Sequence, residues 1–346
     1  MLKLCLLLLL VAILFPISKG GFSITPIEED IADYRWNLGS WEATHLWGKW
    51  IYKVKAALTF DKSDAQSDGF LVPFFDISHK IYKLEKIPEK ARGVQETSSS
   101  GSSTTSSTSQ IASLHESQSK LKPLVEDYIE GIVSMVLSNH GLESRLGFLW
   151  PPVDVDFSNA PYVLVVSPRD KIERSMTLTL SPSLSSTTID ELERGLMVDH
   201  NVSALITGIG GIATYPSIVP PSQGIRRSLR SLAHEWLHQY WFFRALGSNY
   251  WRDSNMTTLN ETAASLAGYE IGDHVLQALG NNEEIMIAKH DSDPTHNNEF
   301  DFKYEMRHTR LIVEEMLSDG MMDQAETYME DRRLMFENEG FYIRKL

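Results

Sequence analysis

Cysteine is almost absent from this chain, since Cys5 is the only one among 346 residues. A single thiol cannot form a disulfide within the chain, so the fold must be stable without one in any compartment. Basic residues are also scarce, with 32 Lys and Arg against 46 Asp and Glu and a net charge of −14. A general nucleic-acid-binding protein needs a basic face that neutralises phosphates, so the composition argues against that class of partner.

The N-terminal hydrophobic run is short for a transmembrane helix. It extends over the 14 residues Leu4–Ile17, whereas a membrane-spanning helix needs about 20. Lys3 precedes the run and a polar stretch follows it, as in a signal peptide, but no clean small-x-small cleavage site follows. We therefore expect residues 1–21 to be a signal peptide or N-terminal membrane anchor, and the protein to be extracytoplasmic, either secreted or attached to the membrane by this segment.

The rest of the chain divides by composition. Residues 22–93 predict a helical N-terminal region, and apolar residues recur at helical spacing in its Trp-rich part, 26–55. Packing of these aromatic residues against the domain is the favoured interpretation, and a platform for carbohydrate or a lipid surface is the alternative. Residues 94–120 are rich in Ser and Thr and predict a flexible linker or insertion. The remainder, 121–346, is expected to form the main domain.

The main domain has a mixed pattern of helices and strands. A helix is expected over 121–141, with Gly141 as its stop. Strands are expected within 160–168, 175–182 and 202–220, where β-branched residues or alternation occur between prolines and glycines. Helices follow to the C-terminus. This order predicts an α+β fold, with a small β-sheet ahead of the helices.

An HExxH motif follows the strands. One helix is expected over 222–247, with Ser222 as its N-cap. Residues i and i+4 share a helix face, so His234 and His238 project together, with Cβ atoms about 6 Å apart. This spacing lets both imidazoles bind one tetrahedral Zn²⁺, with Glu235 as the general base that activates a zinc-bound water. The alternative is an ordinary buried helix that binds no metal.

A catalytic zinc also needs a third protein ligand. The extended pattern HExxHxxGxxH is not present, because Trp241 stands at its glycine and Arg244 at its last histidine. The other solution is a glutamate from a following helix, and Glu261 lies in a predicted helix that has many small residues. Small residues permit the close helix approach that would bring Glu261 to the metal; they are Ala263, Ala264, Ala267 and Gly268.

HEWLH followed by NETAA resembles the gluzincin metallopeptidases, whose zinc ligands are the two HExxH histidines and a glutamate in an NExxA-type helix. The sequences around these motifs are similar to a family of bacterial membrane-associated aminopeptidases. The resemblance implies a gluzincin-like metallopeptidase domain with a peptide substrate. It also implies Zn²⁺ bound by His234, His238 and Glu261, and Glu235 as the catalytic base.

The resemblance further implies a side chain that holds the oxyanion, supplied by the C-terminal helices. Tyr304, Arg307 and His308 have suitable helical spacing, although each type is more often a surface or packing residue. Some relatives orient a zinc-binding histidine with an aspartate four residues after the glutamate ligand. That position is Ser265 here, so the carboxylate candidates are Glu270 and Asp273.

The segment 208–219, GIGGIATYPSIV, has two interpretations. It can be an edge strand that pairs with an extended substrate, or an ordinary core strand with a glycine bulge.

We expect zinc-dependent hydrolysis of extracytoplasmic peptides, with aminopeptidase activity implied by the resemblance alone. A zinc endopeptidase is a close alternative, because no acidic residue stands out as the anchor for a substrate amine. A non-catalytic envelope or scaffold protein with a degenerate metallopeptidase domain is another. Asn260 begins an N-glycosylation sequon beside Glu261, and a glycan there would obstruct the site, so a bacterial cell envelope is the expected location.

Overall fold

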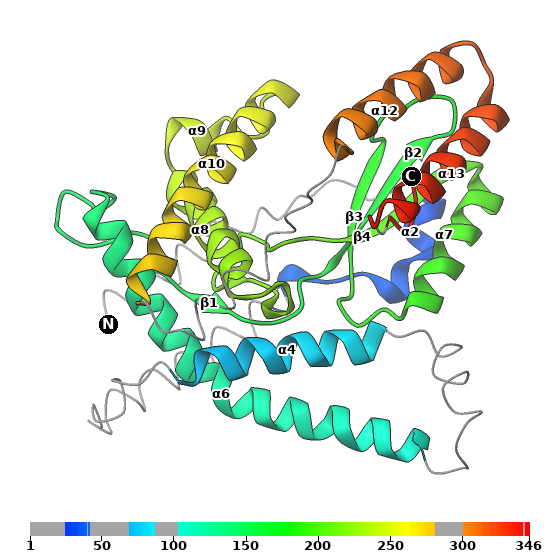
Figure 1. Cartoon of the computed structure of the whole chain (residues 1–346). Coiled ribbons are helices and arrows are strands. Elements are labelled where there is room, and N and C mark those ends of the chain that lie inside the picture. The colour runs from blue at the N-terminus through cyan, green and yellow to red at the C-terminus, as the bar shows by residue number, and fades with distance from the viewer. Residues whose placement is uncertain (1–24, 40, 42–68, 87–102, 281–299, 342) are drawn as a thin grey trace. The chain divides into compact units, whose positions relative to one another are not determined.

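The structure is a computed structural model that describes residues 25–39, 41, 69–86, 103–280, 300–341 and 343–346 (Figure 1). The expected signal peptide or anchor, 1–21, lies outside these residues. None of the described helices is long and apolar enough to cross a membrane. The chain divides into two units, Met1–Tyr34 and Arg35–Leu346.

The first unit contains helix α2 (Pro26–Asp30) and the 3₁₀ helix η1 (Ala32–Tyr34). A capping box starts α2, because Thr25 Oγ1 accepts the Glu28 N–H at 3.3 Å and the Glu28 carboxylate accepts the Thr25 N–H at 3.0 Å. Half of the Trp-rich segment 26–55, residue 40 and residues 42–55, lies outside the described residues.

The second unit combines helices with two small sheets, which confirms the expected α+β class. In chain order its elements are α4 (Leu71–Lys86), α6 (Ser103–Asn139), β1 (Val155–Asp156), β2 (Tyr162–Pro168), β3 (Met176–Leu180), α7 (Ser186–His200), β4 (Val202–Gly208), β5 (Ser217–Ile218), η2 (Pro221–Gln223), α8 (Ile225–Trp241), α9 (Ala245–Ser248), α10 (Ser254–Ala278), α12 (Phe302–Ser318) and α13 (Met322–Asn338).

The larger sheet is antiparallel, with the strand order β3-β2-β4. Leu164 at its centre pairs with Leu178 of β3 and Ile206 of β4. Leu164, Val166, Ala204 and Ile206 are buried, as expected for one apolar face of a sheet. The smaller sheet joins β1 and β5 in parallel. Strands therefore occur in all three predicted segments, but β4 ends at Gly208, and the chain is irregular before β5.

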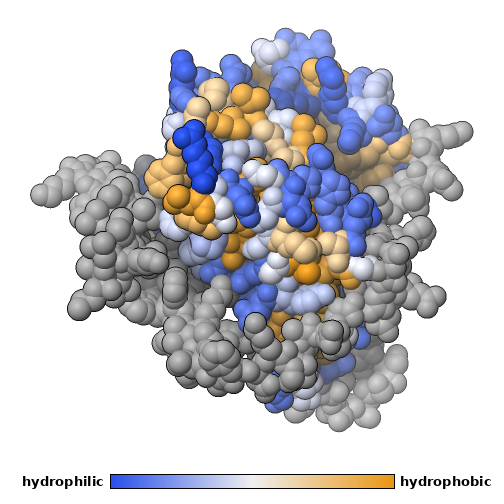
Figure 2. Space-filling model, turned by 90° about the vertical axis from the view of Figure 1, so that its left-hand side faces the viewer, coloured by the Kyte–Doolittle hydropathy of each residue, from blue (hydrophilic) through white to orange (hydrophobic). Residues whose placement is uncertain are grey.

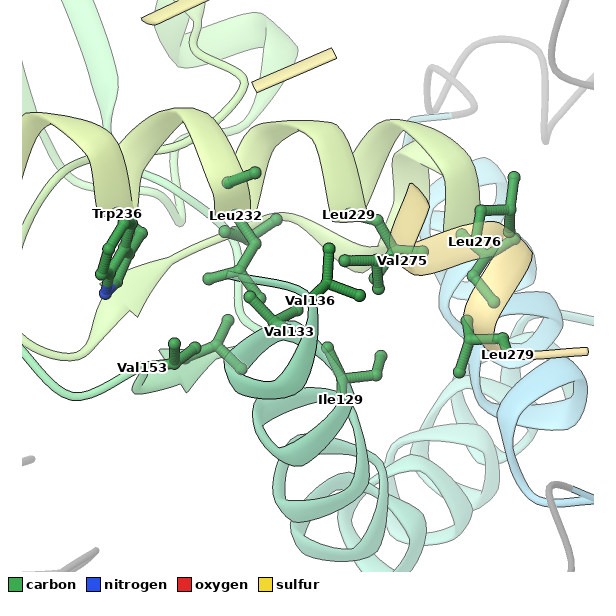
Figure 3. Close-up of a cluster of buried hydrophobic side chains, with 14 of the residues drawn as sticks. Ile129, Val133, Val136, Val153, Leu229, Leu232, Trp236, Val275, Leu276 and Leu279 are labelled. Carbon is green, nitrogen blue, oxygen red and sulfur yellow. The ribbon is translucent and has the colours of Figure 1, made fainter. Parts of the chain in front are cut away.

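The main core lies where α8 meets α6 and the C-terminal end of α10 (Figure 3). Burial of each large apolar side chain contributes about 1.5–3 kcal/mol, so this contact holds α8 firmly. The Trp236 indole is also fixed, because its Nε1–H donates to the Pro151 carbonyl at 3.0 Å. The side chains in this contact include Ile129, Val133 and Val136 of α6, Leu229, Leu232 and Trp236 of α8, and Val275, Leu276 and Leu279 of α10.

Helix α6 is longer than the sequence predicted. It begins at Ser103, within the segment 94–120 that we expected to be a linker or insertion. The reason is tertiary, because this part of α6 packs against α4, and Gln118 Nε2 donates to Ser78 Oγ at 2.8 Å. The C-terminal stop is as expected, with Gly141 in a left-handed conformation (φ 73°) just beyond Asn139.

Exposed apolar side chains follow the HExxH helix. Figure 2 views the side on which α9 and α10 lie in Figure 1, and its apolar orange areas are separated by hydrophilic blue ones. The surface there is therefore mixed rather than continuously apolar. The exposed residues from the end of α8 into α10 include Phe242, Phe243, Trp251, Leu259 and Leu266.

Candidate metal centre

Helix α8 carries the HExxH motif and is shorter than expected. It begins at Ile225 after Gly224, whose φ of 84° suits glycine, and Ser222 lies in the preceding η2, so the predicted Ser222 N-cap is wrong. The helix ends at Trp241 instead of Gly247, because Arg244 is extended (φ −112°, ψ 165°) and starts the separate helix α9. The motif itself lies well inside α8.

A row of small residues brings α10 against α8. A Cβ atom added to Gly268 would lie 2.9 Å from the backbone nitrogen of His234, and one on Gly272 would lie 2.6 Å from Cα of Arg230. Ala264, one turn before Gly268, is fully buried. The two helix backbones therefore approach closely, as the small residues predicted. This places the first half of α10 beside the HExxH side chains.

Three predicted ligand atoms meet at this crossing. The Nε2 atoms of His234 and His238 are 2.9 Å apart, and Glu261 Oε2 lies 3.4 Å and 3.6 Å from them. Tetrahedral zinc with bonds of about 2.0–2.1 Å separates its ligand atoms by about 3.3 Å. The donor types therefore suit a zinc ion, and the two separations from Glu261 lie close to this value.

Glu235 lies beside this cluster and is only 9% exposed. The ligand atoms of His234, Glu235 and His238 all lie within 4.8 Å of one another. Burial raises the pKa of Glu235 to about 7, although the neighbouring His234 and His238 lower it. A carboxyl group with such a pKa can both accept and return a proton near neutral pH.

The charges of the ligands are coupled. Hydrogen bonds from His234 and His238 hold the pKa of Glu261 well below its usual range, although burial opposes them. Burial by itself lowers the pKa of His238, but its hydrogen bond to Glu261 and the charge of that carboxylate outweigh burial and raise it. Glu261 is therefore ionised and lies next to both imidazoles. A carboxylate must be ionised to bind a metal.

Ser265 occupies the position of the expected orienting carboxylate. Its Oγ lies 3.5 Å from His234 Nδ1, at the limit of a hydrogen bond. Asp273 instead forms a bidentate ion pair with Arg230, whose Nε and Nη2 donate to Oδ1 and Oδ2 at 3.0 Å and 2.7 Å. Glu270 is exposed. Neither carboxylate candidate thus has a described contact with the histidines.

Tyr250, which the sequence did not single out, completes the cluster. Its hydroxyl donates to Glu261 Oε1 at 2.6 Å, and its ring packs edge-on against His238 with 6.1 Å between ring centres. Burial raises the pKa of Tyr250, and the hydrogen bond to Glu261 raises it further, so the phenol stays protonated and can donate. In the sequence, only the position of Tyr250 between HExxH and NExxA could have indicated a place at the cluster, because the connection from α9 to α10 has no periodic pattern.

The candidate oxyanion donors lie on another helix. Tyr304, Arg307 and His308 are exposed on α12, which packs against α13. Tyr304 and His308 stack on each other with nearly parallel rings 6.0 Å apart. Within the part of the chain that the structure describes, no hydrogen bond or ring contact joins them to the cluster.

The segment after β4 passes over the cluster. A Cβ atom added to Gly211 would lie 2.8 Å from Glu235 Oε1, so only glycine fits there without displacement. The Gly210 carbonyl accepts a hydrogen bond from Gln223 Nε2 at 3.2 Å, and Ile212 bridges to Ile218. The predicted edge or bulge segment therefore begins as an irregular strip, residues 208–212, in which Gly211 lies beside Glu235.

Comparisons of the chain with protein-family models, curated proteins and solved structures find no match. Two helices and one loop bring together two imidazoles, a charged carboxylate, a buried carboxyl group and a phenol.

Proposed function

We propose that the protein is a zinc metallopeptidase of the gluzincin type that hydrolyses peptide bonds. The observation that carries the proposal is the approach of Glu261 to both HExxH histidines across the α8–α10 contact, at 3.4 Å and 3.6 Å, beside the buried Glu235. A merely structural HExxH helix would not require a carboxylate from another helix at this point. The signal peptide or anchor expected at 1–21 supports an activity outside the cytoplasm, and the sequon at Asn260 beside Glu261 supports a bacterial cell envelope.

The side chains supply the proton transfers of such a reaction. Zn²⁺ held by His234, His238 and Glu261 would supply Lewis-acid chemistry, which acidifies water and polarises a carbonyl oxygen. Glu235 accepts the proton of the attacking water on its carboxylate and then donates it to the leaving amine.

Tyr250 is positioned to stabilise the reacting carbonyl. Its protonated hydroxyl donates to Glu261 beside both histidines, so a donor is present where a substrate carbonyl would meet the cluster. Donors preorganised in this way stabilise the negative charge that develops on the oxygen. This role replaces the one that the sequence suggested for Tyr304, Arg307 or His308.

The strip beside Glu235 is suited to an extended substrate. Within the described residues, the backbone N–H and C=O groups of Ile209 and Gly211 make no hydrogen bond. An extended peptide can pair with such groups by strand addition. For the type of peptidase, we propose an aminopeptidase on the basis of the resemblance, with an endopeptidase as the alternative.

Hydrolysis of a peptide library by the purified full-length chain loaded with Zn²⁺ tests the proposal, with Glu235→Gln measured beside it. We expect the wild type to cleave peptides and Glu235→Gln to be about 10²–10⁴-fold slower, because it lacks the general base. Cleavage products that lack only N-terminal residues indicate an aminopeptidase, and internal cuts indicate an endopeptidase.

Metal analysis separates the alternatives. Equal inactivity of wild type and Glu235→Gln, with zinc bound to both, would show a non-catalytic scaffold protein. The same low zinc content in wild type and His234→Ala would show that HExxH is only a core helix.

A further inference from the structure

A cavity of about 1350 Å³ lies at the N-terminal end of α8. Its wall includes α4, the start of β2, the end of β4, η2 and the segment 182–186. Sites for small molecules typically measure about 300–1,000 Å³. The cavity therefore has room for several units of a polymer.

The lining of the cavity combines aromatic and polar side chains. Trp36 and Trp41 lie 6.1 Å apart with their rings tilted by 47°, and Trp36 is attached to β3 because its N–H donates to the Thr179 carbonyl at 3.1 Å. Asp76 and Asn159 are polar members of the same wall. Two of the tryptophans from the Trp-rich segment thus line a cavity, with chemistry that fits either a peptide or a glycan.

The strip that passes Glu235 leads directly to this cavity. Gly208 and Ile209 line the cavity, whereas Gly211 lies against Glu235. Ile209 and Gly211 are only two residues apart, so the cavity begins next to the part of the strip that lies against Glu235. Gln223 joins the cavity to the strip, because its side chain lines the cavity and donates to the Gly210 carbonyl. A ligand aligned on the strip would therefore enter the cavity.

The backbone of the strip favours a peptide over a glycan. Ile209 and Gly211 offer N–H and C=O groups that make no hydrogen bond within the described chain. A peptide satisfies such groups with its own alternating N–H and C=O groups, whereas a glycan lacks this repeat.

We propose that this cavity binds the part of an extended peptide substrate that lies beyond the bond aligned with Glu235. The cavity then gives the site a preference for longer peptides. The inference takes the position of the cleaved bond from the proposed function.

A bulky substitution in the cavity wall tests this role. Ser183 is an exposed member of the wall, so Ser183→Trp occupies part of the cavity without a change in the buried core. Thr187→Trp is the matched control, because Thr187 is exposed just beyond the wall residue Ser186. The substrates are an aminoacyl amide with a fluorescent leaving group and internally quenched peptides of increasing length.

In kinetics, Ser183→Trp should lower kcat/KM for long peptides about tenfold more than for the aminoacyl amide, which corresponds to about 1.4 kcal/mol of lost binding. Thr187→Trp should leave the ratio of the two kcat/KM values unchanged. A uniform decrease for all lengths in Ser183→Trp would overturn the proposal.

Binding without catalysis separates this inference from the proposed function. A fluorescently labelled unstructured peptide is titrated into full-length Glu235→Gln, with and without Ser183→Trp, and its anisotropy is measured. Loss of binding through Ser183→Trp supports the cavity site, even if the wild type hydrolyses no peptide and the proposed function fails. Three results would overturn the cavity site. They are no peptide binding, equal peptide binding by both variants, and binding of a chitin-type oligosaccharide in place of the peptide.

Discussion

Glu235 and Tyr250 show how single residues acquire reactivity from their surroundings. Glu235 is enclosed by α8 and by the glycine strip, so its charged form loses hydration and its pKa rises to about 7. Tyr250 is held as a donor because its partner, Glu261, is a carboxylate whose pKa is held low by two imidazoles. Neither property is intrinsic to the residue type.

The raised pKa of Glu235 predicts a pH-dependent stability in the metal-free protein. The unfolded chain releases this proton near pH 4.5 and the folded chain near pH 7. Folding stability therefore falls as pH rises from about 4.5 to about 7, by up to about 3 kcal/mol, and the loss is complete above that range. Glu235→Gln should raise Tm at pH 8 and have little effect at pH 4, measured by thermal unfolding with a chelator present.

The exposed Glu270 supplies the control for this measurement. Glu270→Gln should leave the Tm close to that of the wild type at both pH values, because this side chain is in water in both states. An equal effect of Glu235→Gln at pH 4 and pH 8 would contradict the assignment.

Removal of the Tyr250 hydroxyl should affect catalysis more than the zinc content in excess Zn²⁺, because all three zinc ligands remain. Tyr250→Phe should lower kcat about 10²-fold with little change in KM, because one preorganised donor is lost. Its zinc content should stay at the wild-type level. Tyr269→Phe, on the exposed side of α10, is the control. An unchanged kcat in Tyr250→Phe would exclude this hydroxyl from the reaction.

At the scale of elements, the α8–α10 contact determines the geometry of the site. The two histidines come from one helix and the glutamate from the other, so the ligand separations depend on how closely the helices approach. Gly268 and Gly272 set that approach, because each faces backbone atoms of α8. The apolar core in Figure 3, which includes the C-terminal end of α10, also holds α8 in place.

A methyl group at Gly268 should separate these helices. Gly268→Ala should cost about 1–3 kcal/mol of unfolding free energy, since the added carbon meets rigid backbone of His234. It should also weaken zinc binding, measured by competition with a chromogenic chelator. Gly195→Ala in α7 is the control: nothing lies within 4 Å of its added Cβ, and alanine should stabilise that helix by about 0.5–1 kcal/mol. Similar effects of both substitutions would contradict a close helix contact.

At the scale of the second unit, the C-terminal residues are attached to the sheet region through one buried acid. Glu193 of α7 is 5% exposed and accepts the Ile206 N–H at 2.5 Å. Arg344 binds the same carboxylate through two nitrogens, at 2.5 Å and 2.9 Å, and also donates to the Ile206 carbonyl. Segments far apart in the sequence are thus joined around one charge.

Loss of this arginine should destabilise the whole unit. Arg344→Met should lower the free energy of unfolding by about 1–3 kcal/mol, because it removes the main cation from a buried carboxylate. Arg333→Met is the control, since its partners Glu330 and Glu337 are exposed and such pairs contribute about 0–1 kcal/mol. Denaturant unfolding measures both, and a smaller effect of Arg344→Met than of Arg333→Met would refute this role.

The sequence by itself determined the strand segments, the HExxH helix, and the α+β class. It also determined which residues could meet: His234 and His238 share a helix face, and small residues predicted the approach of α10 that carries Glu261. These inferences succeed because they depend on local periodicity and side-chain size.

Only the tertiary structure decided the helical start of α6, the placing of Ser265 and Tyr250 at the cluster, and the position of Gly211 over Glu235. Each of these depends on contacts between segments far apart in the chain or on an irregular loop. Such contacts are set by packing, which leaves no period in the sequence, and so the residues that tune the site were decided by the fold.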